Sequence, residues 1–271
     1  MTSPGTITTL AGSHGALALH RWSAQQPSFV ALLAHGYGEH AGRYDHVARR
    51  LSDAGGAVYA PDHIGHGRSE GERAHVELLE DIVTDLGTVA KHATAEHPGL
   101  PVVLIGHSLG GIVSVRYVQR AVGPVDALVL SGPVIGGNPA ITALLDLDPI
   151  PDVPLDPAAL SRDPAVGAAY AADPLVYHGP FHRESLQTLK DVVATIAAGP
   201  GLGDLPTLWI HGELDPLAPL AETRAAFERI GGSNLRQKVY PGALHEIFNE
   251  TNSDEVLDDV VAFVREAVPA R

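Results

Sequence analysis

Hydrophobic residues form short runs along the chain, and longer amphipathic stretches separate these runs. The run 29–34 is apolar at every position, which is typical of a strand buried on both faces. Residues 15–22 alternate between apolar and polar side chains, as expected of an edge strand. Similar short runs predict further strands at 57–60, 102–106, 127–130, 207–211 and 235–240. The stretches between them have helical periodicity, at 43–54, 75–97, 109–121, 220–230 and 254–268.

Strands that alternate with helices indicate an α/β fold, with a central, mostly parallel sheet flanked by helices. The chain has 271 residues, of which 45% are hydrophobic and 18% are charged, so it can bury a large core. Its net charge of −14 disfavours nucleic acids and anionic membrane surfaces as electrostatic partners. The lack of cysteine excludes disulfides, thiolate metal sites and a cysteine nucleophile.

A proline-rich stretch interrupts the alternation of strands and helices. Residues 133–180 contain nine prolines, and four of the Asn-Pro or Asp-Pro pairs in this stretch, at 138–139, 156–157, 163–164 and 173–174, stand at the start of short pieces. Each such pair combines a helix N-cap with a proline suited to the first turn, so we expect several short helices. The stretch predicts an inserted helical cap at 133–190, with 1–132 and 191–271 forming the core. The alternative is that this stretch is a long surface loop without a function.

A Gly-x-Ser-x-Gly sequence joins the predicted strand at 102–106 to the helix that follows it. The serine is Ser108, between Gly106 and Gly110. Such a sharp turn presents a serine hydroxyl at the end of a sheet, and its glycines relieve the crowding around it. The helix begins at Leu109, whose backbone N–H can bind a developing oxyanion. We therefore predict Ser108 as a nucleophile.

Partners for this serine can be sought by chain order, since the fold places an acid and then a histidine after it. The chain has fifteen histidines, and His245 alone lies beyond Asp215. Asp215 follows the predicted strand at 207–211 through a short turn, and Glu213 in the same turn is the alternative acid. We predict that His245 acts as the base and Asp215 orients it. For Asp215, a purely turn-capping role before a proline is the competing interpretation.

The second oxyanion donor is expected in the loop after the strand at 29–34. This loop contains Gly36, Tyr37 and Gly38, and its glycines let the Tyr37 N–H turn toward the Leu109 N–H. Only the backbone of Tyr37 is assigned to this role. Asp62, His63 and His66, with His35 nearby, could suggest a metal, but a His-Gly turn explains their spacing better, so we predict no metal site.

Three further segments resemble monoacylglycerol lipases of the α/β-hydrolase superfamily, especially the bacterial members. They are HGYGEHAGRY at 35–44, PDHIGHGRSEG at 61–71 and PGALHEIFNE at 241–250. These three segments and the Gly-x-Ser-x-Gly turn are four motifs in register with those of the family. The resemblance extends over about 15–268. It implies hydrolysis of a monoacylglycerol to glycerol and a fatty acid, without a cofactor.

The resemblance also implies that Glu39, Arg43 and Tyr170 bind the glycerol end of the substrate. Glu39 and Arg43 could equally form an ion pair that holds their loop against the body of the protein. The cap is expected to carry the acyl tunnel. Its segment 139–147 is predicted as a compact apolar helix, in which Ile141, Leu144, Leu145 and Leu147 either roof the tunnel or form a patch that touches aggregated lipid.

Two other functions use the same residues. A broader carboxylesterase or lysophospholipase would share the triad, whereas a ligand-binding protein would retain the pocket without turnover. An acid-nucleophile hydrolase is excluded because position 108 is serine. Residues 1–10 lack the features of a secretory signal, and no apolar run is long enough to span a bilayer. We therefore expect a soluble, cytoplasmic protein that makes at most peripheral contact with lipid.

Overall fold

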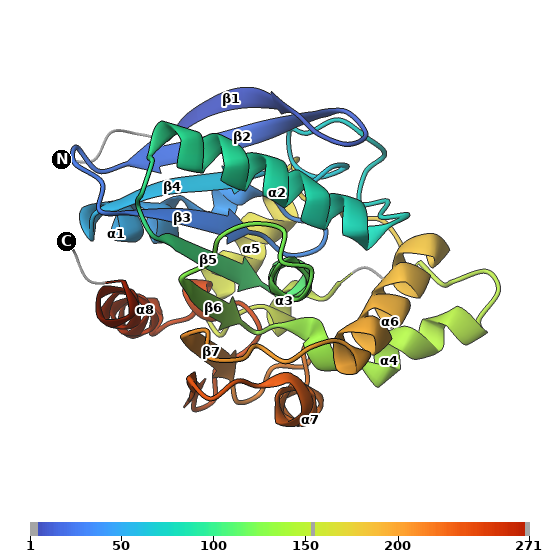
Figure 1. Cartoon of the computed structure of the whole chain (residues 1–271). Coiled ribbons are helices and arrows are strands. Elements are labelled where there is room, and N and C mark those ends of the chain that lie inside the picture. The colour runs from blue at the N-terminus through green and yellow to red at the C-terminus, as the bar shows by residue number, and fades with distance from the viewer. Residues whose placement is uncertain (1–4, 153–154, 269–271) are drawn as a thin grey trace.

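The computed structural model describes residues 5–152 and 155–268. Its centre is an eight-stranded sheet in the order β1-β2-β4-β3-β5-β6-β7-β8 (Figure 1). The β1–β2 and β2–β4 pairs are antiparallel, and all other neighbours are parallel. The strands are β1 (Thr6–Ala11), β2 (Ala16–Ser23), β3 (Phe29–Ala34), β4 (Gly56–Pro61), β5 (Val102–His107), β6 (Ala127–Ser131), β7 (Thr207–Gly212) and β8 (Leu235–Tyr240). The predicted α/β class and mostly parallel sheet are confirmed.

Helices cover both faces of the sheet, because every central strand is apolar on both sides. One face packs against α2 (Leu79–Glu96), α3 (Leu109–Gln119) and α7 (Leu220–Ile230). The other face packs against α1 (Asp45–Asp53) and α8 (Ser253–Ala267). Along β3, Val30 and Leu32 belong to the first cluster and Ala31 and Leu33 to the second, so the unbroken apolar run follows from two-sided burial.

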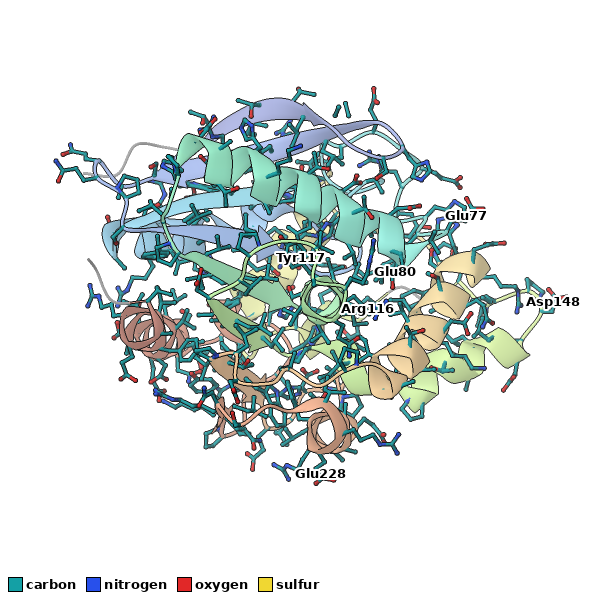
Figure 2. All side chains as sticks on the ribbon, viewed as in Figure 1. Glu77, Glu80, Arg116, Tyr117, Asp148 and Glu228 are labelled. Atoms are coloured by element: carbon teal, nitrogen blue, oxygen red, sulfur yellow. The ribbon has the colours of Figure 1, made fainter. Side chains whose placement is uncertain are left out.

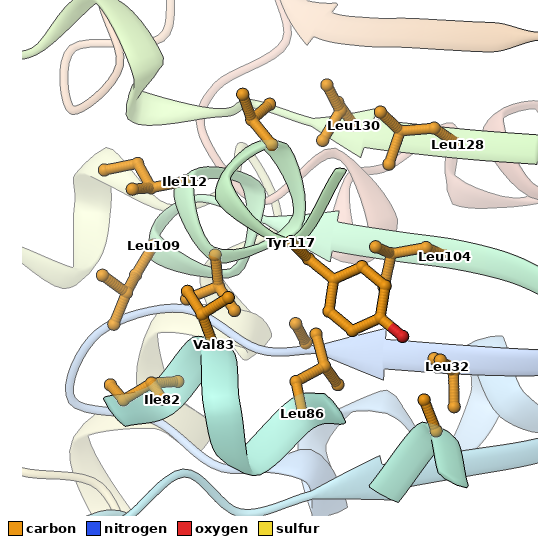
Figure 3. Close-up of a cluster of buried hydrophobic side chains, with 14 of the residues drawn as sticks. Leu32, Ile82, Val83, Leu86, Leu104, Leu109, Ile112, Tyr117, Leu128 and Leu130 are labelled. Atoms are coloured by element: carbon orange, nitrogen blue, oxygen red, sulfur yellow. The ribbon is translucent and has the colours of Figure 1, made fainter. Parts of the chain in front are cut away.

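The first of these clusters supports the turn that contains Ser108. Figure 3 shows Val83 and Leu86 of α2 facing Leu32 and Leu104 of the sheet, beside α3. An ion pair between Arg116 Nε and Glu80 Oε1, 2.7 Å apart, adds a polar link between α3 and α2 (Figure 2). Helix α3 is thus held firmly behind the residue at its N-terminal end.

The chain between β6 and β7 forms the expected series of short helices. Helices α4 (Pro139–Thr142) and α6 (Arg183–Ala198) lie side by side beyond the carboxyl ends of the parallel strands (Figure 1). Between them come 3₁₀ turns at Ala143–Asp146 and Pro157–Ala159, and α5 (Pro164–Ala172). The side chains of Asn138, Asp156 and Asp163 accept hydrogen bonds from backbone N–H groups and cap three of these pieces.

Other expectations for this stretch are wrong. Asp173 and its proline begin a turn rather than a helix, because the Asp173 carboxylate accepts a hydrogen bond from the Leu175 N–H and pairs with His40. Segment 139–147 is not one helix but a single α turn followed by a 3₁₀ turn. Helix α6 is an element that the sequence patterns do not predict, since only four of its residues are buried.

The N-terminal edge of the sheet also differs from the prediction. Strand β1 pairs along the whole of β2 up to Arg21, so β2 is an inner strand and not an edge strand. Almost every position of β1 is exposed, which explains why no apolar pattern predicts it. Throughout 5–152 and 155–268, no helix combines the length and hydropathy that a membrane crossing requires.

Candidate active site

Ser108 occupies a strained turn between β5 and α3. Its φ and ψ are +53° and −115°, in a region that non-glycine residues rarely adopt. A Cβ at Gly106 would lie 2.2 Å from the Gly110 carbonyl oxygen, and one at Gly110 would lie 2.0 Å from the Ala34 carbonyl oxygen. Both positions therefore require glycine, as the sequence pattern predicts.

The structure brings the three predicted triad residues together. His245 Nε2 lies 2.9 Å from Ser108 Oγ, and His245 Nδ1 lies 2.8 Å from Asp215 Oδ2. The other oxygen of Asp215 accepts hydrogen bonds from the backbone N–H groups of Leu217 and Ala218, at 2.9 and 2.8 Å. The carboxylate is thus fixed with one oxygen toward the imidazole, and the geometry suits proton transfer from the serine.

The alternative acid, Glu213, has a different partner. Its side chain accepts a hydrogen bond from the Gly242 N–H at 2.9 Å, so it joins the turn after β7 to the loop that precedes His245. Glu213 itself is exposed, whereas Asp215 is buried. The contact with the imidazole is made by Asp215, and Glu213 supports the loop.

Burial and neighbouring charges shift the pKa values of His245 and Asp215. Burial favours neutral His245, but the charge and hydrogen bond of Asp215, with smaller contributions from Glu246 and Glu39, outweigh burial and raise the pKa of His245. Burial likewise opposes ionisation of Asp215, and the His245 charge prevails, which lowers the pKa of Asp215. Both shifts favour an ion pair during proton transfer.

The expected oxyanion donors lie beside the nucleophile. Among the described residues, the backbone N–H groups of Tyr37 and Leu109 have no hydrogen-bond acceptor. A Cβ at Gly36 would lie 3.3 Å from Ser108 Cβ, so the loop passes very close to the nucleophile. The two free donors therefore remain available for a substrate oxygen.

A cavity of about 540 Å³ opens at Ser108. Much of its wall is apolar and comes from α3 and from the chain between β6 and β7; examples are Ile112, Val134, Ile141, Leu186, Leu189 and Val193. Near His245 its wall is polar and includes Glu39, Tyr170 and Glu246. The cavity can therefore hold a ligand with an apolar tail and a polar head.

The chain is similar to known lipases over most of its length. Residues 25–252 match the family described as serine aminopeptidase, S33. The monoacylglycerol lipase of Mycolicibacterium smegmatis is 42% identical to this chain over 88% of each protein. The human monoglyceride lipase is 32% identical and covers 83% of this chain and 77% of its own. The chain belongs to the monoacylglycerol lipase family of α/β-hydrolases. The crystal structure of the Paleococcus ferrophilus monoacylglycerol lipase superimposes with a TM-score of 0.78 at 28% identity, covering 92% of this chain and 99% of that one.

Within this family member, Arg43 connects two carboxylates at the polar end of the cavity. Its guanidinium donates to Glu39 Oε2 at 2.5 Å, and to both oxygens of Glu246 at 2.6 and 2.7 Å. The ring of Tyr170 lies under the guanidinium, 5.0 Å away. Glu39 also accepts hydrogen bonds from the Gly36 N–H and the Tyr44 hydroxyl. The network therefore connects the loop that contains Tyr37 with the loop that contains His245. An ion pair of this kind was the alternative to substrate binding that the sequence left open for Glu39 and Arg43.

Of the cap residues expected at the substrate, Ile141 and Tyr170 line the cavity. Leu144 and Leu145 are half-buried and do not line it, whereas Thr142, Ala143 and Asp146 do. Arg183 of α6 holds this turn through the carbonyl oxygens of Leu145 and Leu147. Leu147 is 47% exposed.

The histidines near the Tyr37 loop form a hydrogen-bonded cluster. His35 Nδ1 donates to the Gly36 carbonyl, its Nε2 accepts from the His63 N–H at 2.9 Å, and His63 Nε2 donates to the His35 carbonyl. Burial is the main cause that lowers the pKa of His63 to about 3. Within the described part of the chain, no group of three or more histidine, aspartate or glutamate side chains is arranged to hold a metal ion.

Two residues of the site were not singled out from the sequence. Glu246 follows His245 directly and belongs to the segment 241–250, but nothing in the sequence predicts its contact with Arg43. Asn138 donates from Nδ2 to the carbonyls of Pro216 and Leu217, which braces the loop that carries Asp215. Its position before a proline predicts only a helix cap, so the second role had no sequence signal.

Proposed function

We propose that this protein is a serine hydrolase that cleaves monoacylglycerols to glycerol and a fatty acid. The observation that carries the proposal is the 2.9 Å contact between His245 Nε2 and Ser108 Oγ, with the free N–H groups of Tyr37 and Leu109 beside it. The names of the relatives in the family supply the substrate class.

In this mechanism the Ser108 hydroxyl attacks the ester carbonyl while His245 accepts its proton. The Tyr37 and Leu109 N–H groups bind the resulting oxyanion. Collapse of the tetrahedral intermediate breaks the ester bond, and the imidazolium gives its proton to the leaving glycerol oxygen. A water molecule then attacks the acyl-enzyme with His245 as base, and the fatty acid leaves.

The two ends of the cavity fit the two parts of the substrate. The apolar wall around Ile141, Leu189 and Val193 suits the acyl chain, and the polar end at Glu39 and Tyr170 suits the glycerol hydroxyls. In this assignment Arg43 orients Glu39 rather than contacting the substrate, since its donors already face carboxylates. A cap over 133–190 and a cytoplasmic location stay predictions.

The test is fatty-acid release from monoacyl-, diacyl- and triacylglycerols of matched chain length. Ser108→Ala serves as the blank. We expect selective release from the monoacyl ester. Comparable turnover of all three, or turnover of short methyl and aryl esters alone, would instead support a general carboxylesterase that uses the same triad.

A further inference from the structure

The polar end of the cavity carries more negative than positive charge. Glu39 and Glu246 both line it, and Arg43, which pairs with both, does not. All four carboxylate oxygens accept hydrogen bonds from N–H or O–H donors, the geometry of two ionised groups. One guanidinium therefore stands against two carboxylates, which leaves a net charge of about −1 in a poorly solvated place.

No other cation on this wall restores the balance. Among the described lining residues, the remaining Lys or Asp/Glu side chains are Lys190 and Asp146, both exposed and opposite in charge. Asp215 adds a further buried carboxylate behind His245.

We propose that this negative end of the cavity selects the alcohol of the ester by charge. It accepts neutral polyols and cationic amino alcohols, and it excludes alcohols that carry phosphate or carboxylate. An anion within about 6 Å of one uncompensated charge, at an effective dielectric constant of about 20, is disfavoured by roughly a hundredfold. The inference rests on the proposed function, and it disfavours esters of glycerol phosphate as substrates.

The experiment compares three short-chain esters with the same acyl group, all kept monomeric in solution. Their alcohols are glycerol, a trimethylammonium propanediol and glycerol phosphate. For the wild-type protein we expect kcat/KM for the phosphate ester to be about a hundredfold below that for the glycerol ester, mainly through KM. The cationic ester should equal or exceed the neutral one.

Two variants test the origin of the discrimination. Glu246→Gln removes one carboxylate, so that Arg43 is paired with Glu39 alone, and it should lower the neutral-to-phosphate ratio of kcat/KM by about a hundredfold, to near unity. Glu228→Gln makes the same change on the exposed side of α7 (Figure 2) and should leave the ratio unchanged. Because Glu246→Gln could fail to fold, wild-type inhibition by non-hydrolysable ethers with the same three head groups gives a second readout. There the phosphate ether should inhibit about a hundredfold more weakly than the neutral ether.

Equal kcat/KM for the three esters, or equal effects of the two variants on the ratio, would overturn the inference while leaving monoacylglycerol hydrolysis intact. Turnover of the phosphate ester without turnover of the glycerol ester would overturn both. No turnover of any glycerol-based ester, with aryl esters still cleaved, would contradict the proposed function alone, and the ether inhibition series would still decide the charge preference.

Discussion

His245 Nε2 lies 2.9 Å from Ser108 Oγ, although the two residues are 137 positions apart in the chain. Parallel strands account for this contact. Ser108 follows β5 and His245 follows β8, and the carboxyl ends of all parallel strands meet at one edge of the sheet. Asp215 follows β7, the neighbour of β8, and reaches the far side of the imidazole.

Loss of the nucleophile or base should abolish nearly all turnover. Ser108→Ala and His245→Ala should each lower kcat by about a millionfold, and Asp215→Asn by about ten-thousandfold, because the three groups act as a unit. Initial rates on a monoacylglycerol measure this. Glu213→Gln is the matched control, since its carboxylate binds the Gly242 N–H and not the imidazole. A loss from Glu213→Gln as large as that from Asp215→Asn would contradict the assignment of the acid.

The pH dependence of activity should report His245. Because Asp215 overcomes burial and raises the pKa of His245 above its ordinary value of 6.5, the neutral base forms only at higher pH. We expect kcat/KM to rise with pH through an apparent pKa above 6.5. Rates on a neutral, soluble ester over pH 5–9 provide the measurement. A midpoint below 6.5 would show that burial dominates and that the Asp215 contact is weak in solution.

The strands of the core and the triad were predictable because each has a strong local signal. A strand such as β3 is apolar on both faces, and the Ser108 turn must have glycines where backbone atoms crowd. Chain order then selects the other two triad residues. These signals do not depend on distant contacts, and so the sequence is sufficient to find them.

The remaining features depend on contacts that sequence patterns do not encode. Strand β1 is held by backbone pairing to β2 and has almost no buried side chains. After Thr142 the chain forms a 3₁₀ turn instead of a longer helix, and Arg183 of α6 donates to the Leu145 carbonyl in this turn. The same holds for Arg43, whose two partners come from loops about two hundred positions apart.

Acid should destabilise the fold through buried neutral histidines. Burial lowers the pKa of His63 to about 3, and burial together with the His245 charge lowers that of His107 to about 3. A folded-state pKa below the unfolded value gives stability that is present above about pH 6.5 and is lost as the pH falls toward 3. Each such histidine can contribute up to about 1.4 kcal/mol per pH unit to this loss.

The measurement is the free energy of unfolding from urea titrations at pH 7.5, 6 and 5. We expect a steady decrease over this range, which partner carboxylates with lowered pKa values, such as Asp62, extend to lower pH. A flat profile between pH 7.5 and 5 would contradict the prediction.

We predict that segment 139–147 touches aggregated lipid through leucines that do not line the cavity. Leu147 is exposed, and the half-buried Leu144 and Leu145 do not line the cavity, so this turn can present apolar side chains to a lipid surface. Leu145→Asp and Leu147→Asp should therefore lower activity on emulsified monoacylglycerol several-fold, because a charge at an apolar contact must be desolvated. Activity on a short soluble ester should change little, since neither residue lines the cavity at Ser108. Leu214→Asp, an exposed leucine in the turn before Asp215, controls for the added charge and should not separate the two substrates. Equal losses on emulsion and soluble ester would mean that the leucines support the fold of the cap, and docking through this turn would be wrong.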